Sequence, residues 1–331
     1  MRHGETVPQP LSPPTIESIG EGARKVYLLL GYRCNEKCLF CGVGEDKPIQ
    51  WPLINERMYD AQQIKQHIEN LVEAGLGERD VLEFSGGEPT IHRDVIDILS
   101  YARKNFTGRI LLFSNGVRFA SESFTRDYLS AGVDNTIITL HGSHAELHDR
   151  ISGTPGSFKH TVAGLERLHD AGHDLSVKFI VNRLNYTDAE HWAEFTSKRL
   201  PRARLMINGL ALWGQSVVNA EELSVRHSEV ARHVESAVDR ATRNGSNVGI
   251  YFMPACVFDP SYWQFFGYRY YKESVLEATS GAEEHRSISY SNCYNMPKAC
   301  SGCVMQPRCT WAWKPYSDRY GLNELQPALL A

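Results

Sequence analysis

The sequence contains no long apolar run, which argues against a membrane-spanning protein. No stretch approaches 18 apolar residues, so we expect no membrane span and no membrane partner. The opening residues MRHGETVPQPLSPPTIESIG contain no apolar h-region, so we expect no secretory signal and a cytoplasmic protein. Positive charge is not in excess either, because the net charge is −4 and the pI about 6.4. This balance argues against a nucleic-acid binder that depends on phosphate neutralisation.

The cysteines are clustered in a large, apparently cytosolic chain, which argues against a disulfide framework. The eight cysteines of the 331 residues form one group at 34–41, a second group at 293–309, and Cys256 alone. Thiols stay reduced in the cytosol, and clustered cysteines are typical of metal sites. The sequence therefore predicts metal centres at the two groups.

Most of the chain alternates strand-like and helix-like segments. The strand-like runs lie at 25–32, 81–86, 109–116, 135–142, 175–182 and 204–210, and the helix-like segments at 59–74, 92–104, 121–131, 157–171 and 187–199. Such alternation implies parallel strands joined by right-handed crossovers. Six units predict an α/β fold, either a partial barrel or a doubly wound sheet, with the functional site at the carboxyl ends of the strands.

The pattern changes after about residue 215. A helix at 224–243 and one strand at 247–254 lead into an irregular aromatic stretch and the second cysteine group. We therefore predict an N-terminal arm at 1–24, a barrel at 25–215 and a smaller C-terminal domain at 216–331. The tail at 318–330 is expected to fold back onto the barrel.

The first cysteine group has the spacing C-x3-C-x2-C, formed by Cys34, Cys38 and Cys41. Three thiolates can bind three irons of a [4Fe–4S] cube and leave the fourth iron open to a substrate or cofactor. The motif resembles the signature of the radical S-adenosylmethionine (radical SAM) family, which favours an aromatic residue at the position of Phe40, beside the adenine. A zinc loop or three incidental buried thiols are the alternatives for this loop alone.

A second motif, FSGGEPT at 84–90, strengthens the resemblance. Gly86 and Gly87 let the backbone approach a ligand closely, and Glu88 offers a carboxylate to an ammonium group. The segment is similar to the GGE segment of the family, which binds the amino group of S-adenosylmethionine. The alternative for a GGE segment alone is an ordinary turn between a strand and a helix.

Further candidate cofactor contacts follow the later strands. Ser114 and Asn115 end the third strand within reach of a cofactor ribose or carboxylate, although an ordinary Asn-Gly turn explains them equally well. His141 follows the fourth strand and is expected to face the cofactor or the substrate, with a structural role as the alternative. By resemblance, Asn182 after the fifth strand is a ribose contact. No residue is assigned as a catalytic acid or base.

The second cysteine group resembles the auxiliary-cluster segment of the SPASM and twitch subfamilies of radical SAM enzymes. Its core is Cys300-x2-Cys303-x5-Cys309. The full SPASM form uses seven cysteines for two clusters, whereas this chain has only five outside the first motif. The resemblance therefore implies a twitch-like domain with one auxiliary [4Fe–4S] cluster. Cys256 is the preferred fourth ligand and Cys293 the alternative, and a structural zinc knuckle is the competing interpretation.

The resemblance implies reductive cleavage of S-adenosylmethionine to a 5′-deoxyadenosyl radical, which abstracts hydrogen from a substrate carbon. An electron donor such as flavodoxin or ferredoxin is then expected. Peptide modification, by cross-linking or side-chain oxidation, is the favoured reaction. The alternative is dehydrogenation or rearrangement of a sugar or small metabolite. A non-catalytic iron–sulfur or zinc redox sensor is a third hypothesis, against which the GGE segment argues.

Overall fold

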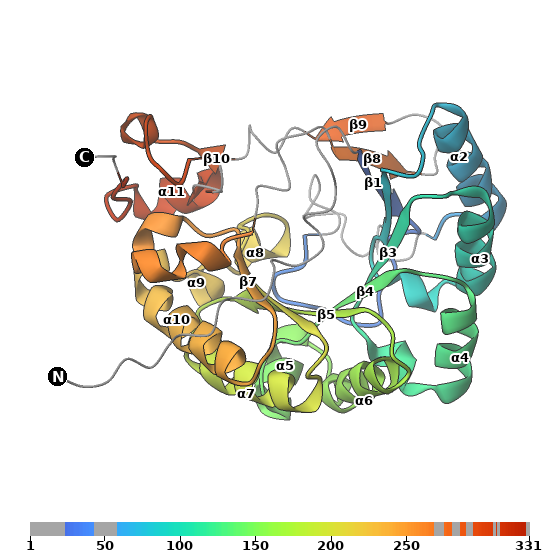
Figure 1. Cartoon of the computed structure of the whole chain (residues 1–331), viewed down its shortest axis with the longest axis horizontal. Coiled ribbons are helices and arrows are strands. Elements are labelled where there is room, and N and C mark those ends of the chain that lie inside the picture. Colours follow the sequence, from blue (N-terminus) through green and yellow to red (C-terminus); the bar gives the residue numbers. More distant parts are fainter. Residues whose placement is uncertain are drawn as a thin grey trace.

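A single curved sheet organises the molecule. The computed structural model describes residues 24–42, 58–267, 275–279, 285–288, 294–306, 309 and 312–328. In this part of the chain nine strands form one sheet in the order β7-β6-β5-β4-β3-β2-β1-β8-β9. Figure 1 shows the sheet curving, with the long helices arranged along its outer side. The predicted α/β class and partial barrel are confirmed.

The strands are short and mostly parallel. Their bounds are β1 (Lys25–Leu29), β2 (Val81–Ser85), β3 (Arg109–Ser114), β4 (Asn135–Thr139), β5 (Leu175–Val181), β6 (Arg204–Gly209), β7 (Val248–Tyr251), β8 (Val275–Thr279) and β9 (His285–Ile288). Neighbours from β7 through β8 pair in parallel, and β9 pairs antiparallel with β8. A separate antiparallel pair joins β10 (Tyr294–Asn295) to β11 (Ala312–Trp313). Parallel strands end at one common edge, so the loops after β1 to β6 meet there.

Amphipathic helices cover the outer face. Their bounds are α2 (Ala61–Glu73), α3 (Val95–Asn105), α4 (Glu122–Ser130), α5 (Ala145–Ser152), α6 (Ser157–Asp170), α7 (Ala189–Arg199), α8 (Gln215–Val218), α9 (Ala220–Leu223), α10 (His227–Arg243) and α11 (Lys314–Tyr320). In α2, the buried residues Ile64, Ile68 and Leu71 recur at three- and four-residue steps and face the sheet. None of the helices in the described part of the chain has the length and apolarity that crossing a bilayer requires.

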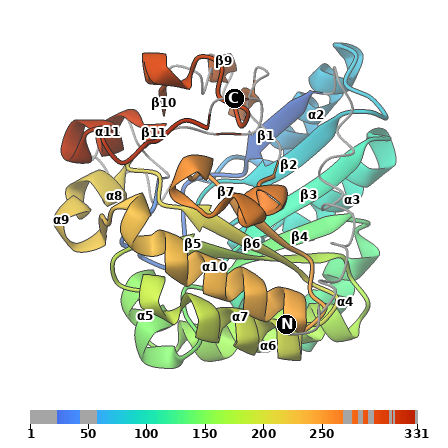
Figure 2. The ribbon, with the colours of Figure 1, turned by 60° about the vertical axis from the view of Figure 1, so that its left-hand side comes forward.

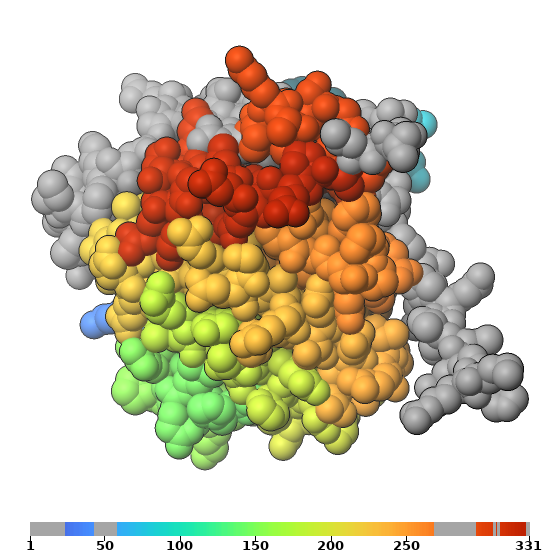
Figure 3. Space-filling view, turned by 90° about the vertical axis from the view of Figure 1, so that its left-hand side faces the viewer, coloured from blue at the N-terminus to red at the C-terminus, as the bar shows by residue number. Residues whose placement is uncertain are grey.

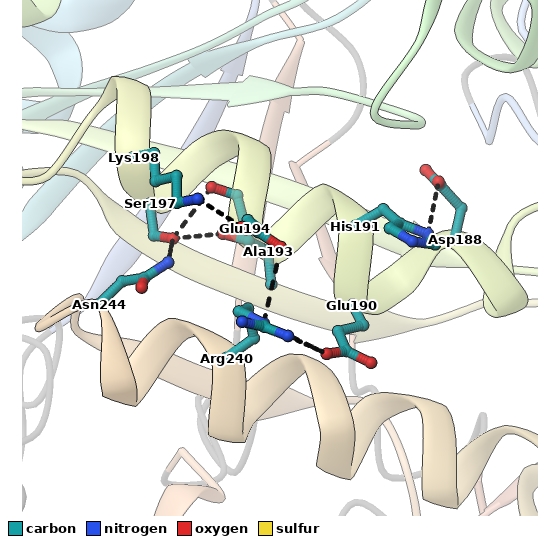
Figure 4. Close-up of polar contacts among 9 residues, drawn as sticks. All are labelled: Asp188, Glu190, His191, Ala193, Glu194, Ser197, Lys198, Arg240 and Asn244. Atoms are coloured by element: carbon teal, nitrogen blue, oxygen red, sulfur yellow. Dashed lines mark hydrogen bonds and ion pairs between the residues drawn. The ribbon is translucent and has the colours of Figure 1, made fainter.

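The sheet continues past the predicted domain boundary at 215/216. β7 pairs with β6, so the strand that we assigned to the C-terminal domain extends the barrel. α10 lies along α7 on the outside of the sheet, as Figure 2 shows. Figure 4 shows Arg240 of α10 bound to Glu190 at 2.7 Å, and the Asn244 amide donating to Ser197 Oγ at 2.7 Å. The prediction is thus corrected for α10 and β7, and the division of the remaining residues stays a prediction.

The C-terminal residues pack over the start of α10. Figure 3 shows them, in red, lying against the yellow and orange surface of α8 to α10. The His227 N–H donates to Tyr316 Oη at 2.8 Å, and the two rings stack with their centroids 4.1 Å apart. Tyr316 Oη donates to the Glu324 carboxylate, which also accepts from the Ser228 N–H at 3.0 Å. Tyr320, Leu322 and Leu325 pack in one apolar cluster with Leu210 and Leu212, so the expected return of the tail onto the barrel is confirmed for these three residues.

Candidate functional site

The first cysteine group lies in the loop directly after β1. Two backbone hydrogen bonds hold this loop against the end of α5: the Lys37 N–H donates to Ser152 O at 2.9 Å, and the Leu39 N–H donates to Ile151 O at 3.0 Å. The next residue, Gly153, has φ 61°, and a Cβ there would lie 2.4 Å from the Lys37 carbonyl oxygen. Glycine therefore permits the close contact that positions the loop.

The three thiols of this loop influence one another electrostatically. Burial raises the pKa of both the Cys34 thiol and the Cys38 thiol well above the usual range. The nearby Cys41 and the Glu36 carboxylate add to the increase for both thiols, and Glu88 adds to it for Cys34. Three thiolates at this position therefore need a cationic partner, which the irons of a cluster supply. The chemistry of this donor set fits the predicted [4Fe–4S] cluster.

The glycines of the GGE segment bring the end of β2 against the residues before Cys34. Gly86 has φ 125°, and a Cβ on it would lie 2.3 Å from the Gly31 carbonyl oxygen. A Cβ on Gly87 would lie 2.3 Å from the Arg33 carbonyl oxygen, and the Gly87 N–H donates to Gly31 O at 2.9 Å. This close backbone contact by itself explains why both positions are glycine. Their predicted contact with the cofactor stays a prediction.

Glu88 connects the ends of β2 and β3. Its carboxylate is 2% exposed, and Oε1 accepts from the Thr90 N–H (3.0 Å), Thr90 Oγ1 (2.6 Å) and Ser114 Oγ (2.8 Å). Oε2 accepts from the Asn115 N–H at 2.6 Å. Burial raises the pKa of Glu88, and these hydrogen bonds oppose the increase. Glu88 thus has a structural role in this loop, in addition to the cofactor contact that the resemblance implies.

Asn115 extends this network to the cysteine loop. Its Nδ2 donates to Asn35 Oδ1 at 2.7 Å and lies 4.0 Å from the Cys34 sulfur. Ser114 Oγ, besides donating to Glu88, accepts from the Gly116 N–H at 2.9 Å. The structure therefore brings the predicted residues Ser114, Asn115 and Glu88 together beside Cys34.

His141 lies beside the same loop. Its ring is 5.0 Å from the Phe40 ring, centroid to centroid, in an edge-on arrangement. Ligand atoms of His141, Glu36 and Cys38 lie within 4.8 Å of one another. Burial, with a contribution from His148, lowers the pKa of His141 well below its usual value, so the ring is neutral. Glu36 was not predicted as part of this site, and its only signal in the sequence is an acidic residue inside the CNEKC loop.

Asn182 lies within its own turn. Its side chain is fully buried, its Nδ2 donates to Ile180 O at 3.0 Å, and its Oδ1 accepts from the Leu184 N–H at 3.0 Å. The Asn182 N–H donates to Asn185 Oδ1 at 2.8 Å. These bonds stabilise the turn after β5, and the predicted ribose contact stays a prediction.

Three cysteines of the second group, Cys300, Cys303 and Cys309, lie near Cys256, which follows β7. Burial raises the pKa of Cys256 to about 11, and the nearby Cys309 and Cys300 thiols contribute to the increase. The Cys303 N–H donates to Cys300 O at 3.1 Å, which shapes the C-x2-C turn. Four thiols in one region fit the ligand set of an auxiliary cluster. Cys293, the alternative ligand, lies outside the described residues, so the choice between it and Cys256 stays a prediction.

A cavity of about 240 Å³ opens beside Phe40. Besides Phe40, three aromatic residues line it, Trp213, Phe252 and Trp313, and the Trp213 and Trp313 ring centroids lie 6.1 Å apart. Lys178 also lines the cavity, although strand periodicity gave no reason to single it out. The cavity therefore borders the cysteine loop at Phe40.

The fold and the three-thiol loop at the carboxyl ends of the strands define an α/β-barrel iron–sulfur protein. The model of the Radical SAM superfamily matches residues 28–196, just over half of the chain, and the chain belongs to this superfamily. The resemblance inferred from the sequence is therefore confirmed.

Two curated relatives are enzymes of this superfamily. The mycofactocin maturase MftC of Mycolicibacterium smegmatis is 29% identical over 199 residues, which cover 58% of this chain and 48% of the relative. The AdoMet-dependent heme synthase of Oleidesulfovibrio alaskensis is 28% identical over 177 residues, which cover 52% of this chain and 42% of the relative. The chain thus spans about half the length of these relatives.

Among solved structures, Streptococcus suis SuiB bound to the precursor peptide SuiA has a similar fold. The TM-score is 0.60 at 12% identity, and the match covers 93% of this chain and 72% of SuiB. A second structure of SuiB contains S-adenosylmethionine. The predicted cofactors, a [4Fe–4S] cluster with S-adenosylmethionine and one auxiliary [4Fe–4S] cluster, agree with this class of enzyme.

Proposed function

We propose that this radical SAM enzyme modifies a peptide, either by forming a cross-link or by oxidising a side chain. The observation that carries the proposal is the aromatic cavity beside Phe40. Its volume of about 240 Å³ lies below the roughly 300–1,000 Å³ of pockets that enclose a drug-sized ligand, so it suits one residue of a longer substrate. The maturase relative and the precursor peptide bound to SuiB support this reading.

The chain's own residues position the reaction. When bound, the [4Fe–4S] cluster and S-adenosylmethionine supply one-electron abstraction of a hydrogen atom. Cys34, Cys38 and Cys41 would hold the cluster, and Glu88 keeps the adjoining strand ends in place. The aromatic walls of the cavity exclude water and orient the substrate group.

The other proposed partners follow from this chemistry. Cys256, Cys300, Cys303 and Cys309 would hold the auxiliary cluster. A reductant such as flavodoxin or ferredoxin would supply electrons, and a cytoplasmic location would keep the clusters reduced.

A small metabolite is the second candidate substrate. The name of the heme synthase relative favours it, because that protein makes a non-peptide product. In that case the reaction would be a dehydrogenation or a rearrangement of a sugar or another small molecule. A redox sensor without catalytic activity is the candidate from a different class.

Anaerobic turnover separates these candidates. The reconstituted enzyme is incubated with S-adenosylmethionine, dithionite, a metabolite extract and a synthetic copy of any short peptide that is found to be encoded beside its gene. We expect 5′-deoxyadenosine and a peptide that is lighter by the mass of two hydrogen atoms. Formation of 5′-deoxyadenosine with an unchanged peptide but a changed metabolite extract would favour the second candidate. Absence of 5′-deoxyadenosine would favour the sensor.

A further inference from the structure

Charged side chains lie on the inner face of the barrel. Lys25 on β1 forms an ion pair with Glu83 on β2, and these side chains are only 12% and 1% exposed. Lys178 on β5 is a second ammonium group in the electrostatic reach of Glu83. Since Glu83 already binds Lys25, it does not fully neutralise Lys178.

Lys178 has no anion of its own in the described part of the chain. Alternation along β5 places Lys178 on the inner face with Ile180, and its ammonium lies 5.0 Å from the centre of the Phe113 ring. No ion pair or hydrogen bond to this ammonium occurs among the described residues. Burial lowers the pKa of Lys178 to about 8, against the opposing charge of Glu83. An anionic ligand strongly stabilises a buried ammonium group that has no ion-pair partner.

Asn208 on β6 presents an unused acceptor to the same cavity. The residue is 2% exposed, and its Oδ1 accepts no hydrogen bond from the residues that the structure describes. Ile180 is its partner across the two strands, so Lys178 and Asn208 are diagonal neighbours on the inner face. An unpaired buried amide oxygen costs free energy unless a ligand donates to it.

The surroundings of this pair favour an anion with an attached apolar group. Phe40, Trp213 and Trp313 line the cavity, and the Trp213 indole N–H donates to Gly42 O at 3.2 Å. Apolar walls lower the local dielectric constant and strengthen an ion pair with Lys178. Because Phe40 immediately precedes Cys41, a group bound here lies next to the cysteine loop.

We propose that Lys178 and Asn208 form a subsite that binds a carboxylate of the substrate. The carboxylate pairs with the Lys178 ammonium, and Asn208 Oδ1 accepts from a neighbouring amide N–H. The inference rests on the proposed peptide substrate, in which either the C-terminus or an acidic side chain supplies the carboxylate.

The test measures binding and does not require turnover. The reconstituted holoenzyme with S-adenosylmethionine is titrated under argon with N-acetyl-L-phenylalanine and, separately, with its C-terminal amide. We expect the acid to bind roughly ten- to a hundredfold more tightly than the amide, the range for a charge-assisted hydrogen bond. N-acetyl-L-glutamic acid α-amide is the second probe, and its affinity relative to the first shows which source of carboxylate the subsite prefers.

Two variants complete the test. Lys178→Met removes the charge at similar length, so the acid should lose its preference over the amide. Lys159→Met, on the exposed side of α6, is the matched control and should retain the preference. Melting curves check that both variants fold, and the wild-type comparison of acid with amide stands without either variant.

Equal affinities of acid and amide in the wild type would overturn the proposal, as would a preference that survives in Lys178→Met. Absence of binding by both carboxylate probes would also overturn it. Because the probes undergo no reaction, these outcomes leave the proposed peptide modification untouched. A preserved acid preference in an enzyme that modifies no peptide would contradict the proposed function and leave the subsite standing.

Discussion

The substitution Glu88→Gln changes one atom of a buried carboxylate that joins the ends of β2 and β3. Oε1 accepts three hydrogen bonds and Oε2 accepts one, from the Asn115 N–H. An amide has one oxygen, so its NH2 group must face either the Asn115 donor or the donors of Thr90 and Ser114. A buried donor without an acceptor costs about 1–3 kcal/mol.

The expected loss of stability lies within that range. Burial raises the pKa of Glu88, so removal of its charge recovers part of the desolvation cost and lowers the net effect. We therefore expect the free energy of unfolding to fall by about 2 kcal/mol. Affinity for S-adenosylmethionine should also fall roughly ten- to a hundredfold, because the carboxylate is predicted to meet the ammonium group of the cofactor.

Two measurements separate these effects. Urea denaturation of the cluster-free protein, followed by circular dichroism, reports the change in stability. Calorimetry on the reconstituted enzyme under argon reports the affinity for the cofactor. Glu146→Gln is the control, since that carboxylate is 88% exposed and should change neither quantity appreciably. Unchanged stability of Glu88→Gln would refute the structural role derived from its hydrogen bonds.

The cysteines of the auxiliary site, and His227 at its contact with Tyr316, give further predictions. Cys256→Ala, or Cys300→Ala combined with Cys303→Ala, should lower iron content by about four atoms per chain, whereas Cys293→Ala should leave it near wild type; zinc in place of this iron would identify a zinc knuckle. Burial lowers the pKa of His227 from 6.5 to about 4, so as pH falls through this window the unfolded state binds a proton that the folded state does not. Stability should therefore decrease through this group as the pH falls from 7 to 4. Melting curves should show a smaller decrease for His227→Phe, and an equal decrease would contradict the assignment.

Local sequence patterns predicted most of the barrel. The strand-like run at 175–182 became β5 and the helix-like segment at 157–171 became α6, because alternation and three-to-four spacing reflect local geometry. The helix α5 was not predicted, since its buried face includes His148 and Ser152 as well as Ile151. Membership of β7 in the barrel was also missed, because strand pairing depends on residues distant in sequence.

The candidate site was predictable where its chemistry is local. The spacing of Cys34, Cys38 and Cys41 is visible in eight residues, and the structure places them in one loop. Lys178 and Asn208 could not be found in this way, because the curvature of the sheet makes a single cavity from separate strands. The residues that surround Lys178 and Asn208 come together only inside the barrel, and no sequence motif near either residue indicates them.

The most direct test of the account is the formation of 5′-deoxyadenosine from S-adenosylmethionine under anaerobic, reducing conditions. The reconstituted wild type should form it, and the variant with Cys34, Cys38 and Cys41 all changed to Ala should form none while keeping about four irons in the auxiliary site. Equal formation by the triple variant, or none by a fully iron-loaded wild type, would contradict the assignment of this loop as the radical-generating centre.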